Sequence, residues 1–394
     1  MNRTCIVKLS HLSKNVFERI RFGQIESAKV WNYCTEQLKL CFEKKREWVK
    51  KYDLQFETKG KYALHSQSVQ QTCRTFVGCV EQTRKNKKID KRRRYPWKEK
   101  KFMPILWPAQ AMSISGNKVI LPMGRGRKNL VFDKPDWLKE KAPSKIIWNS
   151  GYEWHITIEK PNKCKSDIVQ EKPAAIDLGQ IHLGAVVTET GESVIVSGRE
   201  IRSLKRQQNM VIAKMQKRIS KCRKASKLFK KLVRSKKRFL TSMRRRIRDV
   251  RHKATRQIIE FCKENNVTKI SIGDPSGVQK KKCGKKHNQR MSQWEFGKDI
   301  QYITEKAKEY DIDVSKCSER GSSSTCPKCQ HRQKVSGRNW ECKSCGYKEH
   351  RDIVGAINIL RNNIGFTVES LSTTYLQPLK NGSSRCSDTS QLAA

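Results

Sequence analysis

Cys326-Pro327-Lys328-Cys329 and Cys342-Lys343-Ser344-Cys345, with twelve residues between them, decide how this chain is interpreted. Each CxxC turn presents two thiolates at the separation that a tetrahedral zinc ion needs, so two turns fill all four positions of a closed structural site. Redox chemistry is the alternative for a CxxC motif, and two such pairs within twenty residues disfavour it. We therefore predict a zinc ribbon over residues 322–346, with the ligands Cys326, Cys329, Cys342 and Cys345.

Two aspartates deserve comparison with this ribbon, one close to it in the sequence and one far upstream. Asp352 follows the second knuckle and opens an apolar helical segment over residues 353–360. Asp177 ends a predicted strand in the stretch Ala174-Ala175-Ile176-Asp177-Leu178-Gly179. Taken alone, Asp352 would be an ordinary first-turn acid, favourable at a helix N-terminus, and Asp177 a turn-forming residue before glycine. Because both occur together with the ribbon, we interpret them as ligands of a catalytic divalent metal.

The predicted elements downstream of residue 173 alternate between strands and helices. Three strands with tight turns come first, and a long helical region, a strand, a helix, a strand and a last helix follow, over residues 174–177, 183–188, 193–196, 200–265, 269–273, 296–310, 313–317 and 352–362. This order is typical of an α/β RNase H-like fold. In that fold, carboxylates from the first strand, a middle element and a late helix hold two divalent metals roughly 3.5–4 Å apart, and oxygen ligands suit Mg²⁺.

The third carboxylate of such a centre is ambiguous in this sequence. The strand over 269–272 ends in Gly273-Asp274-Pro275, where a glutamate would be expected in place of Gly273. Asp274 is displaced by one residue, so strand alternation turns its side chain to the opposite face, where it could orient the turn. Glu295 lies at the start of the next predicted helix, from which its carboxylate could reach the same centre. Alternatively, it is an ordinary first-turn acid that the helix dipole stabilises. We predict Glu295 as the third catalytic acid, with Asp274 as the alternative.

The charge of the chain indicates a polyanionic partner. Its 394 residues include 85 Lys and Arg against 37 Asp and Glu, a net charge of +48. Such an excess repels itself in a compact state, and binding to phosphates relieves it by releasing condensed counterions. Between Arg202 and Lys253 there are 22 cationic residues and one acid, Asp249. We predict that this segment binds nucleic acid through Lys214, Arg218, Arg223, Lys224, Lys231, Arg234, Arg244, Arg245 and Arg248.

The cysteine count and the apolar patterning indicate the compartment. The chain has 15 cysteines, an odd number, with no apolar signal stretch at its start and no apolar run of the roughly 18–20 residues that cross a bilayer. We therefore expect a reducing cytoplasm, with nucleoid association when DNA is bound, and no membrane partner. A ribosomal-type or chromatin-type basic protein is the alternative, although such proteins seldom combine paired CxxC knuckles with aspartate-bearing strands.

The first 172 residues have a different pattern. A strand is predicted over residues 1–10 and helices over 11–94, where apolar residues recur at three- and four-residue spacing. Residues 95–172 contain short alternating stretches punctuated by Pro, Gly and aromatic residues, which predict a small β-barrel domain. At the other end of the chain, residues 367–394 are rich in Ser and Thr and lack periodicity, so we predict a disordered tail there.

Four stretches together resemble the TnpB (OrfB) family of bacterial insertion sequences, relatives of the type V CRISPR effectors and of the Fanzor proteins. They are residues 175–179, 288–297, 326–345 and 351–360. The resemblance covers most of the chain, and it implies a wedge β-barrel formed by residues 1–10 and 95–172, a helical recognition domain over 11–94, and a split RuvC-like nuclease domain over 173–321 and 347–366, interrupted by the ribbon.

The resemblance also implies a function, that of an RNA-guided, Mg²⁺-dependent DNA endonuclease of a mobile element. A non-coding RNA from the element guides the protein, one protein acts per RNA, and the protein itself reads only a short motif beside the double-stranded target DNA. By the same resemblance, Asp177 and Asp352 take the first and third RuvC positions. Some members of the wider group have a relocated glutamate, which would suit Glu295.

The departure at Gly273-Asp274-Pro275 leaves a second function open, that of an RNA-guided DNA-binding regulator with an inactive centre. Asp177 and Asp352 favour the nuclease, because an inactive protein has no reason to keep them. A transposase proper would need a strand-transfer function, for which the sequence offers nothing beyond the shared fold. A general RNA-binding zinc-ribbon protein is the last alternative, and it would not depend on divalent metal.

Overall fold

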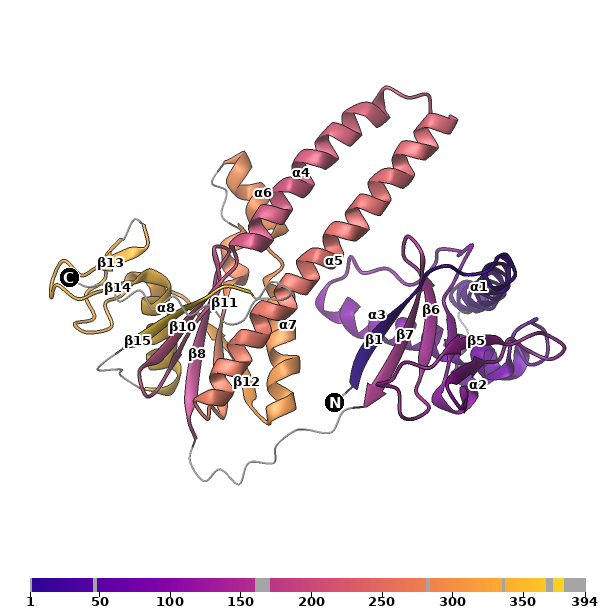
Figure 1. Ribbon diagram of the computed structural model, residues 1–394, viewed down its shortest axis with the longest axis horizontal. Helices are drawn as coiled ribbons and strands as arrows, with labels where there is room; N and C mark the ends of the chain where they lie inside the picture. The colour runs from indigo at the N-terminus through magenta and orange to yellow at the C-terminus, as the bar shows by residue number, and fades with distance from the viewer. Residues whose placement is uncertain are drawn as a thin grey trace. The chain divides into compact units, whose positions relative to one another are not determined.

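The computed structural model describes residues 2–44, 48–159, 171–280, 284–334, 337–365 and 371–378. Two compact units make up the chain, one of residues 2–160 and the other of residues 161–394, and each is described by itself (Figure 1). Within the described ranges, no helix is both long enough and apolar enough to cross a membrane.

The N-terminal unit combines three helices with two antiparallel sheets. One sheet has the order β1-β7-β6-β2 and the other β3-β4-β5. In chain order the elements are β1 (Asn2–Leu9), α1 (Lys14–Glu43), α2 (Lys51–Glu57), α3 (Ser66–Ile89), β2 (Ile105–Trp107), the short helix η1 (Ala109–Ala111), β3 (Ser113–Ser115), β4 (Lys118–Leu121), β5 (Leu130–Asp133), β6 (Ser144–Trp148) and β7 (Tyr152–Glu159).

A single hydrophobic core joins these helices and sheets. The hydroxyl of Ser13 accepts a hydrogen bond from the N–H of Val16 and so caps the start of α1. Helix α1 buries its apolar residues toward α3, where the rings of Trp31 and Phe76 meet edge to face at a centroid distance of 5.0 Å. The same core continues into the strands, where Trp154 is fully buried. Closure of the strands into a barrel, and a division into wedge and recognition domains, stay predictions.

The C-terminal unit is built on a mixed six-stranded sheet with the order β12-β11-β8-β9-β10-β15. Strands β8, β9 and β10 form an antiparallel meander, β11 and β12 run parallel to β8, and β15 runs parallel to β10. The elements are β8 (Pro173–Leu178), β9 (His182–Thr188), β10 (Glu192–Ser197), α4 (Arg199–Ser220), α5 (Lys227–Glu264), β11 (Lys269–Asp274), η2 (Pro275–Lys280), α6 (Lys285–Gln293), α7 (Phe296–Ala307), η3 (Lys308–Tyr310), β12 (Asp313–Ser318), η4 (Ser322–Ser324), β13 (Asn339–Glu341), β14 (Lys348–His350), α8 (Arg351–Ile364) and β15 (Ser372–Leu376).

Helices cover both faces of this sheet, which confirms the predicted mixed α/β class. One face packs against α8 through an apolar cluster that includes Ala185, Ile195 and Ile357. The other face packs against α5 and α7 through a larger cluster that includes Ile258 and Ile303. Strands β8, β9 and β10 supply buried residues to both clusters, so these strands are buried on both sides, as their continuous apolar runs indicate.

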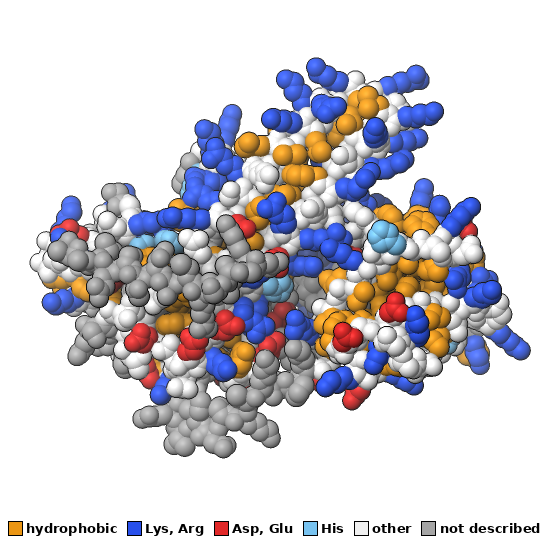
Figure 2. Space-filling view, in the orientation of Figure 1, with side chains coloured by type: hydrophobic (Ala, Val, Ile, Leu, Met, Phe, Trp, Pro, Cys, Tyr) orange, Lys and Arg blue, Asp and Glu red, His pale blue; other side chains and the backbone are white. Residues whose placement is uncertain are grey.

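The long helices α4 and α5 form a hairpin that extends beyond the sheet (Figure 1). Near the sheet they pack through Leu204, Met243, Ile247 and Val250. Farther out the pairing leaves Met210 and Leu228 exposed, and Lys and Arg side chains project along both helices (Figure 2). A helix pair with this surface repels itself, so it is suited to a polyanion.

One prediction for the chain's end is wrong. Residues 372–376, which belong to the segment 367–394 that we predicted to be a disordered tail, form β15 beside β10. The backbone groups of β10 supply this strand with partners, and Ser193 Oγ lies 2.7 Å from Thr373 Oγ1. Thr and Tyr fit a pleated edge well, so a polar composition did not exclude a strand. Residues 367–370 and 379–394 of the predicted tail lie outside the described residues.

Candidate functional site

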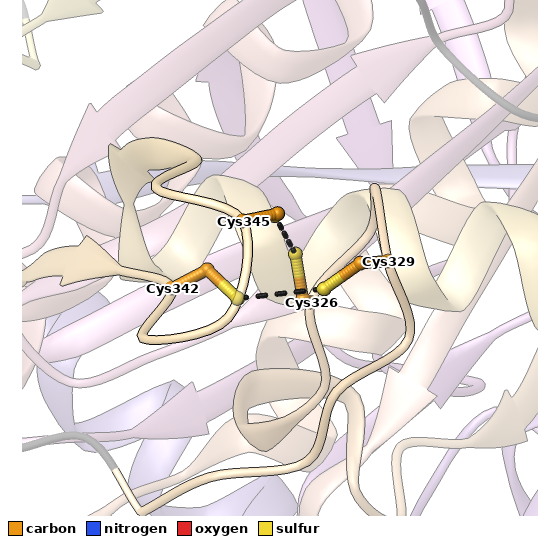
Figure 3. Close-up of side chains that lie close together, drawn as sticks. All are labelled: Cys326, Cys329, Cys342 and Cys345. Atoms are coloured by element: carbon orange, nitrogen blue, oxygen red, sulfur yellow. Dashed lines mark hydrogen bonds between the residues drawn. The ribbon is translucent and has the colours of Figure 1, made fainter.

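The four predicted zinc ligands come together in the ribbon (Figure 3). The sulfurs of Cys326 and Cys345 lie 3.6 Å apart, those of Cys329 and Cys342 lie 3.5 Å apart, and all four lie within 4.8 Å of one another. Tetrahedral Zn²⁺ with Zn–S bonds of about 2.3 Å places its sulfurs about 3.8 Å apart. The cluster therefore has the donor set and the size to hold a zinc ion.

Helix α8 and the ribbon support each other. The side-chain amide of Asn358 is buried and donates to the backbone oxygens of Ser322 and Thr325, at 2.6 and 2.7 Å. Val354 of α8 shares an apolar cluster with Trp340, Cys326 and Cys342 of the ribbon. The ribbon thereby fixes the start of α8, which carries Asp352.

Asp177 lies near the end of β8, paired with Ala185 of β9. Its carboxylate points at the first turns of α8, where a Cβ on Gly355 would overlap it. Only glycine at position 355 lets the helix come this close. Burial, followed by the negative charges of Asp352 and Glu319, raises the pKa of Asp177 well above its usual range. Asp177 is therefore close enough to Asp352 and Glu319 for their charges to act on it.

Asp352, in the first turn of α8, has polar partners from two other elements. Its Oδ2 accepts from Nδ1 of His182 on β9 and from the guanidinium of Arg338 in the ribbon, each at 2.8 Å. Burial alone would raise the pKa of Asp352, but the hydrogen bond from His182 and the charge of Arg338 outweigh it and lower the pKa. Asp352 is therefore ionised at neutral pH and held in a fixed orientation.

His350 caps α8 and completes this group. Its Nδ1 accepts the N–H of Asp352 at 3.2 Å, and burial lowers its pKa to about 4, so the ring is neutral at pH 7. His182, His350 and Asp352 each offer an atom within 4.8 Å of the others, a set that could itself hold a metal ion. Asp352 belongs to both this set and the carboxylate group, so metal bound by either would involve it.

Glu319 is a candidate acid that the sequence analysis did not single out. It follows β12, which runs parallel to β11, and a Cβ added to Gly273 would lie 3.2 Å from Glu319 Oε2. The carboxylate of Glu319 thus borders the space that a side chain at position 273, where a glutamate was expected, would enter. Burial and the charge of Asp274 raise the pKa of Glu319. An acid directly after a strand parallel to the strand of Asp177 was the available signal.

Asp274 and Glu295, the two candidates for the third acid, have other partners. Asp274 accepts a hydrogen bond from the N–H of Ser276 at 3.0 Å. This contact fits its non-catalytic interpretation as the residue that orients the turn after β11. Glu295 caps α7 and forms ion pairs with Lys205, Arg251 and Lys298. Burial alone would raise the pKa of Glu295, but these cations lower it to about 2.

Glu295 thus belongs to a charge cluster on the α5 and α7 side of the sheet. Arg251 also pairs with Asp299, and both are buried. Beside this cluster lies a cleft of about 730 Å³. Its walls carry further cations from α4 and α6, among them Arg202, Arg206 and Arg290. The structure therefore places Glu295 in a neutralised cluster and not in the group formed around Asp177.

The predicted nucleic-acid-binding residues all lie on the α4–α5 hairpin or on the turn between its helices. Except for half-buried Arg245 they are exposed, namely Lys214, Arg218, Arg223, Lys224, Lys231, Arg234, Arg244 and Arg248. Such an array of exposed cations on a rigid pair of helices can follow a phosphate backbone.

Comparisons with known proteins agree with this architecture. Residues 155–279 match the OrfB_IS605 family, described as a probable transposase, and residues 296–359 match the Cas12f1-like TNB domain. The chain is 22% identical over 262 residues to the TnpB-like protein ORF457 of Acidianus two-tailed virus, covering 63% of this chain and 55% of that protein. It is 25% identical over 122 residues to the CRISPR-associated endodeoxyribonuclease Cas12f1 of an uncultured archaeon, covering 29% and 23%.

Among solved structures, a Cas12f1–sgRNA–target DNA complex aligns with a TM-score of 0.65 at 13% identity, over 90% of this chain and 84% of that chain. At this identity the likeness shows a shared fold. The matched regions amount to about half of the viral relative and about a quarter of the archaeal one. Together these matches confirm the resemblance that the sequence motifs indicated.

Proposed function

We propose that this chain, whose matches support the TnpB family related to the type V effectors, is an RNA-guided, metal-dependent DNA endonuclease of a mobile element. The observation that carries the proposal is that Asp177 lies against the first turns of α8, the helix of Asp352, where the charges of Asp352 and Glu319 act on it. The charges of Asp352 and Glu319 raise the pKa of buried Asp177, and a divalent cation beside these carboxylates would relieve that repulsion. An RNase H-like RuvC domain is the fold in which such a group cuts phosphodiesters.

In the proposed centre, Asp177, Asp352 and Glu319 would hold Mg²⁺, which suits carboxylate oxygens. Bound divalent metal activates water and stabilises the leaving oxygen in such centres. The protein's own part is positioning, because His182 orients Asp352 and Gly355 gives Asp177 room beside α8. Glu319 takes the place that we predicted for Glu295.

The ribbon would hold Zn²⁺ through its four cysteines and would act as a structural support. It delivers Arg338 to the carboxylate of Asp352 and fixes the start of α8. Because the thiolates bind metal only when the ribbon is folded, zinc binding would contribute directly to the stability of this region.

The partners proposed are a guide RNA from the element and double-stranded target DNA, with one protein per RNA, in the cytoplasm and associated with the nucleoid when bound to DNA. The exposed cations of the α4–α5 hairpin support the nucleic-acid part of this proposal. The hairpin would grip RNA and heteroduplex through their backbones, which carry no sequence information, while guide pairing selects the target. A short motif beside the target would be read by the N-terminal unit.

Cleavage of a plasmid library with randomised flanks tests the function. The full chain is co-expressed with its flanking locus, and the complex is incubated with Mg²⁺ or with EDTA. Metal-dependent breaks beside one enriched motif are expected. Target DNA that is retained selectively but never cut would overturn the nuclease and establish an inactive RNA-guided regulator, and the absence of any guided retention would overturn both.

A further inference from the structure

The N-terminal unit contains a hollow that the proposed nuclease function does not use. It measures about 400 Å³ and lies between α1, β6, β7 and the segment before β2. We propose that this hollow binds one unpaired nucleobase of an RNA. The proposal rests on the RNA partner of the proposed function, and it adds a site at which the protein reads that RNA directly.

The walls of the hollow are aromatic and partly open to solvent. Trp148 and Tyr152 stand edge to face at a centroid distance of 4.9 Å, and Phe17 lies 5.2 Å from Tyr152. Trp148 is 49% exposed and Phe102 is 48% exposed, whereas Trp107 and Trp154 of the same unit are fully buried. Exposed apolar rings that surround one hollow indicate a binding surface. A planar base can stack on such rings.

A buried amide supplies the polar contact that such a site needs. Gln24 lines the hollow at 4% exposure, and its backbone oxygen accepts the N–H of Met103. Its side-chain amide forms no hydrogen bond with the described residues. The edge of a base presents donors and acceptors that match those of an amide.

The charge around the hollow selects a nucleotide over other planar ligands. Arg21 is exposed at its rim, with its guanidinium carbon 5.9 Å from the centre of the Phe102 ring. None of the nine described residues that line the hollow is acidic. A base held by the rings and Gln24 would therefore leave its phosphate beside Arg21, which suits an anionic backbone.

The shape of the hollow favours unpaired RNA over duplex DNA. The base edges of a duplex are read by helices or strands that enter a groove, whereas a concave aromatic pocket takes a base that has left its stack. Unpaired loops and ends of folded RNA offer such bases without the cost of opening a pair. We therefore assign the hollow to a single-stranded nucleotide of the guide RNA.

Binding of short oligomers to the full-length chain tests this assignment without cleavage. The probes are octamers of uridine, adenosine or cytidine, each carrying one photoreactive thio-base, and the matching DNA octamers. Measurements are made at about 0.3 M salt, where the phosphate contribution shared by all cationic surfaces is reduced. The variants are Trp148→Ala and Gln24→Met, and the matched control is Trp137→Ala, a tryptophan of the same unit that is 40% exposed and does not line the hollow.

Trp148→Ala should weaken binding of the preferred RNA octamer about tenfold, and Trp137→Ala should leave it unchanged. Gln24→Met keeps the walls and should reduce the preference among the three bases. Crosslinks should map to Phe102, Trp148 or Tyr152. If Trp148→Ala unfolds the unit, the base preference of Gln24→Met and the positions of the crosslinks still test whether the hollow binds a base.

Several results would overturn the assignment in different ways. Equal affinities of Trp148→Ala and Trp137→Ala, with crosslinks elsewhere, would remove the hollow as a base site but leave the RNA-guided function intact. Equal use of the hollow by DNA octamers would remove the assignment to RNA. A wild-type chain that binds no RNA at all would sink the RNA partner of the proposed function together with this site.

Discussion

Two groups of carboxylates occupy opposite sides of the same sheet, and they differ in what surrounds them. Asp177, Glu319 and Asp352 gather on the side of α8, where the negative charges of Glu319 and Asp352 raise the pKa of Asp177. Glu295 and Asp299 lie on the side of α5 and α7, where Lys205, Lys298 and buried Arg251 form ion pairs with them. These cations lower the pKa of Glu295 to about 2, whereas burial outweighs them at Asp299 and raises its pKa to about 6.

The difference shows that neighbours, and not the mere presence of acids, define a metal centre. A buried carboxylate that its acidic neighbours repel, as Asp177 is, gains from a divalent cation, whereas a carboxylate paired with several cations, as Glu295 is, gains less. The first group is therefore suited to chemistry and the second to holding helices together. Each prediction below perturbs one group and uses the other as its reference.

The largest effect is expected from the acids that define the first group. Asp177→Ala or Asp352→Ala should lower the cleavage rate by at least about 10³-fold, because each removes a ligand of a centre that acts as a unit. RNA binding, measured by gel shift of the co-purified guide, should stay unchanged. Cutting that survives either substitution would show that the centre lies elsewhere.

The comparison between Glu319 and Glu295 sharpens the assignment of the third acid. Glu319→Ala should lower cleavage by about 10²- to 10³-fold, whereas Glu295→Ala should leave the rate within a few-fold of wild type. The reason is that Glu319 faces Asp177, while Glu295 faces three cations. Rates are measured in single turnover at saturating Mg²⁺, so that weakened metal binding is separated from lost chemistry. The reverse result would restore Glu295 as the third ligand.

Substitutions in the second group should lower the stability of the fold and leave the chemistry intact. Asp299→Ala leaves buried Arg251 with only Glu295 to balance it, and should lower the free energy of unfolding by about 3 kcal/mol. Urea unfolding monitored by circular dichroism gives this value. Adding Arg251→Met should recover part of the loss, because it removes the uncompensated charge. A normal stability but absent cleavage for Asp299→Ala would contradict the structural role.

Much of the first group could be predicted from the sequence, because local patterns place its members. The apolar run after Asp352 fixes a helix, and the strand before Asp177 ends at a Leu-Gly turn, so both acids fall at element ends where sites form. The ribbon spacing identifies four ligands without any tertiary information. These residues needed only local structure to be found.

The third acid could not be predicted in the same way, because its place depends on packing between distant elements. Glu319, which we propose for this place, lies beside Gly273 because β12 pairs in parallel with β11. Glu295 was attractive by position, but Arg251, 44 residues earlier on α5, holds it instead. Strand β15 was missed for a related reason, because its stability comes from the edge of β10.

The smallest effect concerns the metal-free protein and the pKa of Asp177. This pKa is raised in the folded state, so the folded state binds the proton more tightly than the unfolded state does. The resulting stability is fully present below the unfolded pKa of about 4 and is lost as pH rises through the folded pKa. Asp177→Asn removes this titration, so in EDTA the variant should be more stable than wild type near pH 8, with little difference near pH 4. Thermal unfolding across this range measures the gap, and added Mg²⁺ should close it by stabilising only wild type. A gap that grows toward low pH would mean that the carboxylate of Asp177 is stabilised in its charged form, and the two groups of acids would then no longer differ in kind.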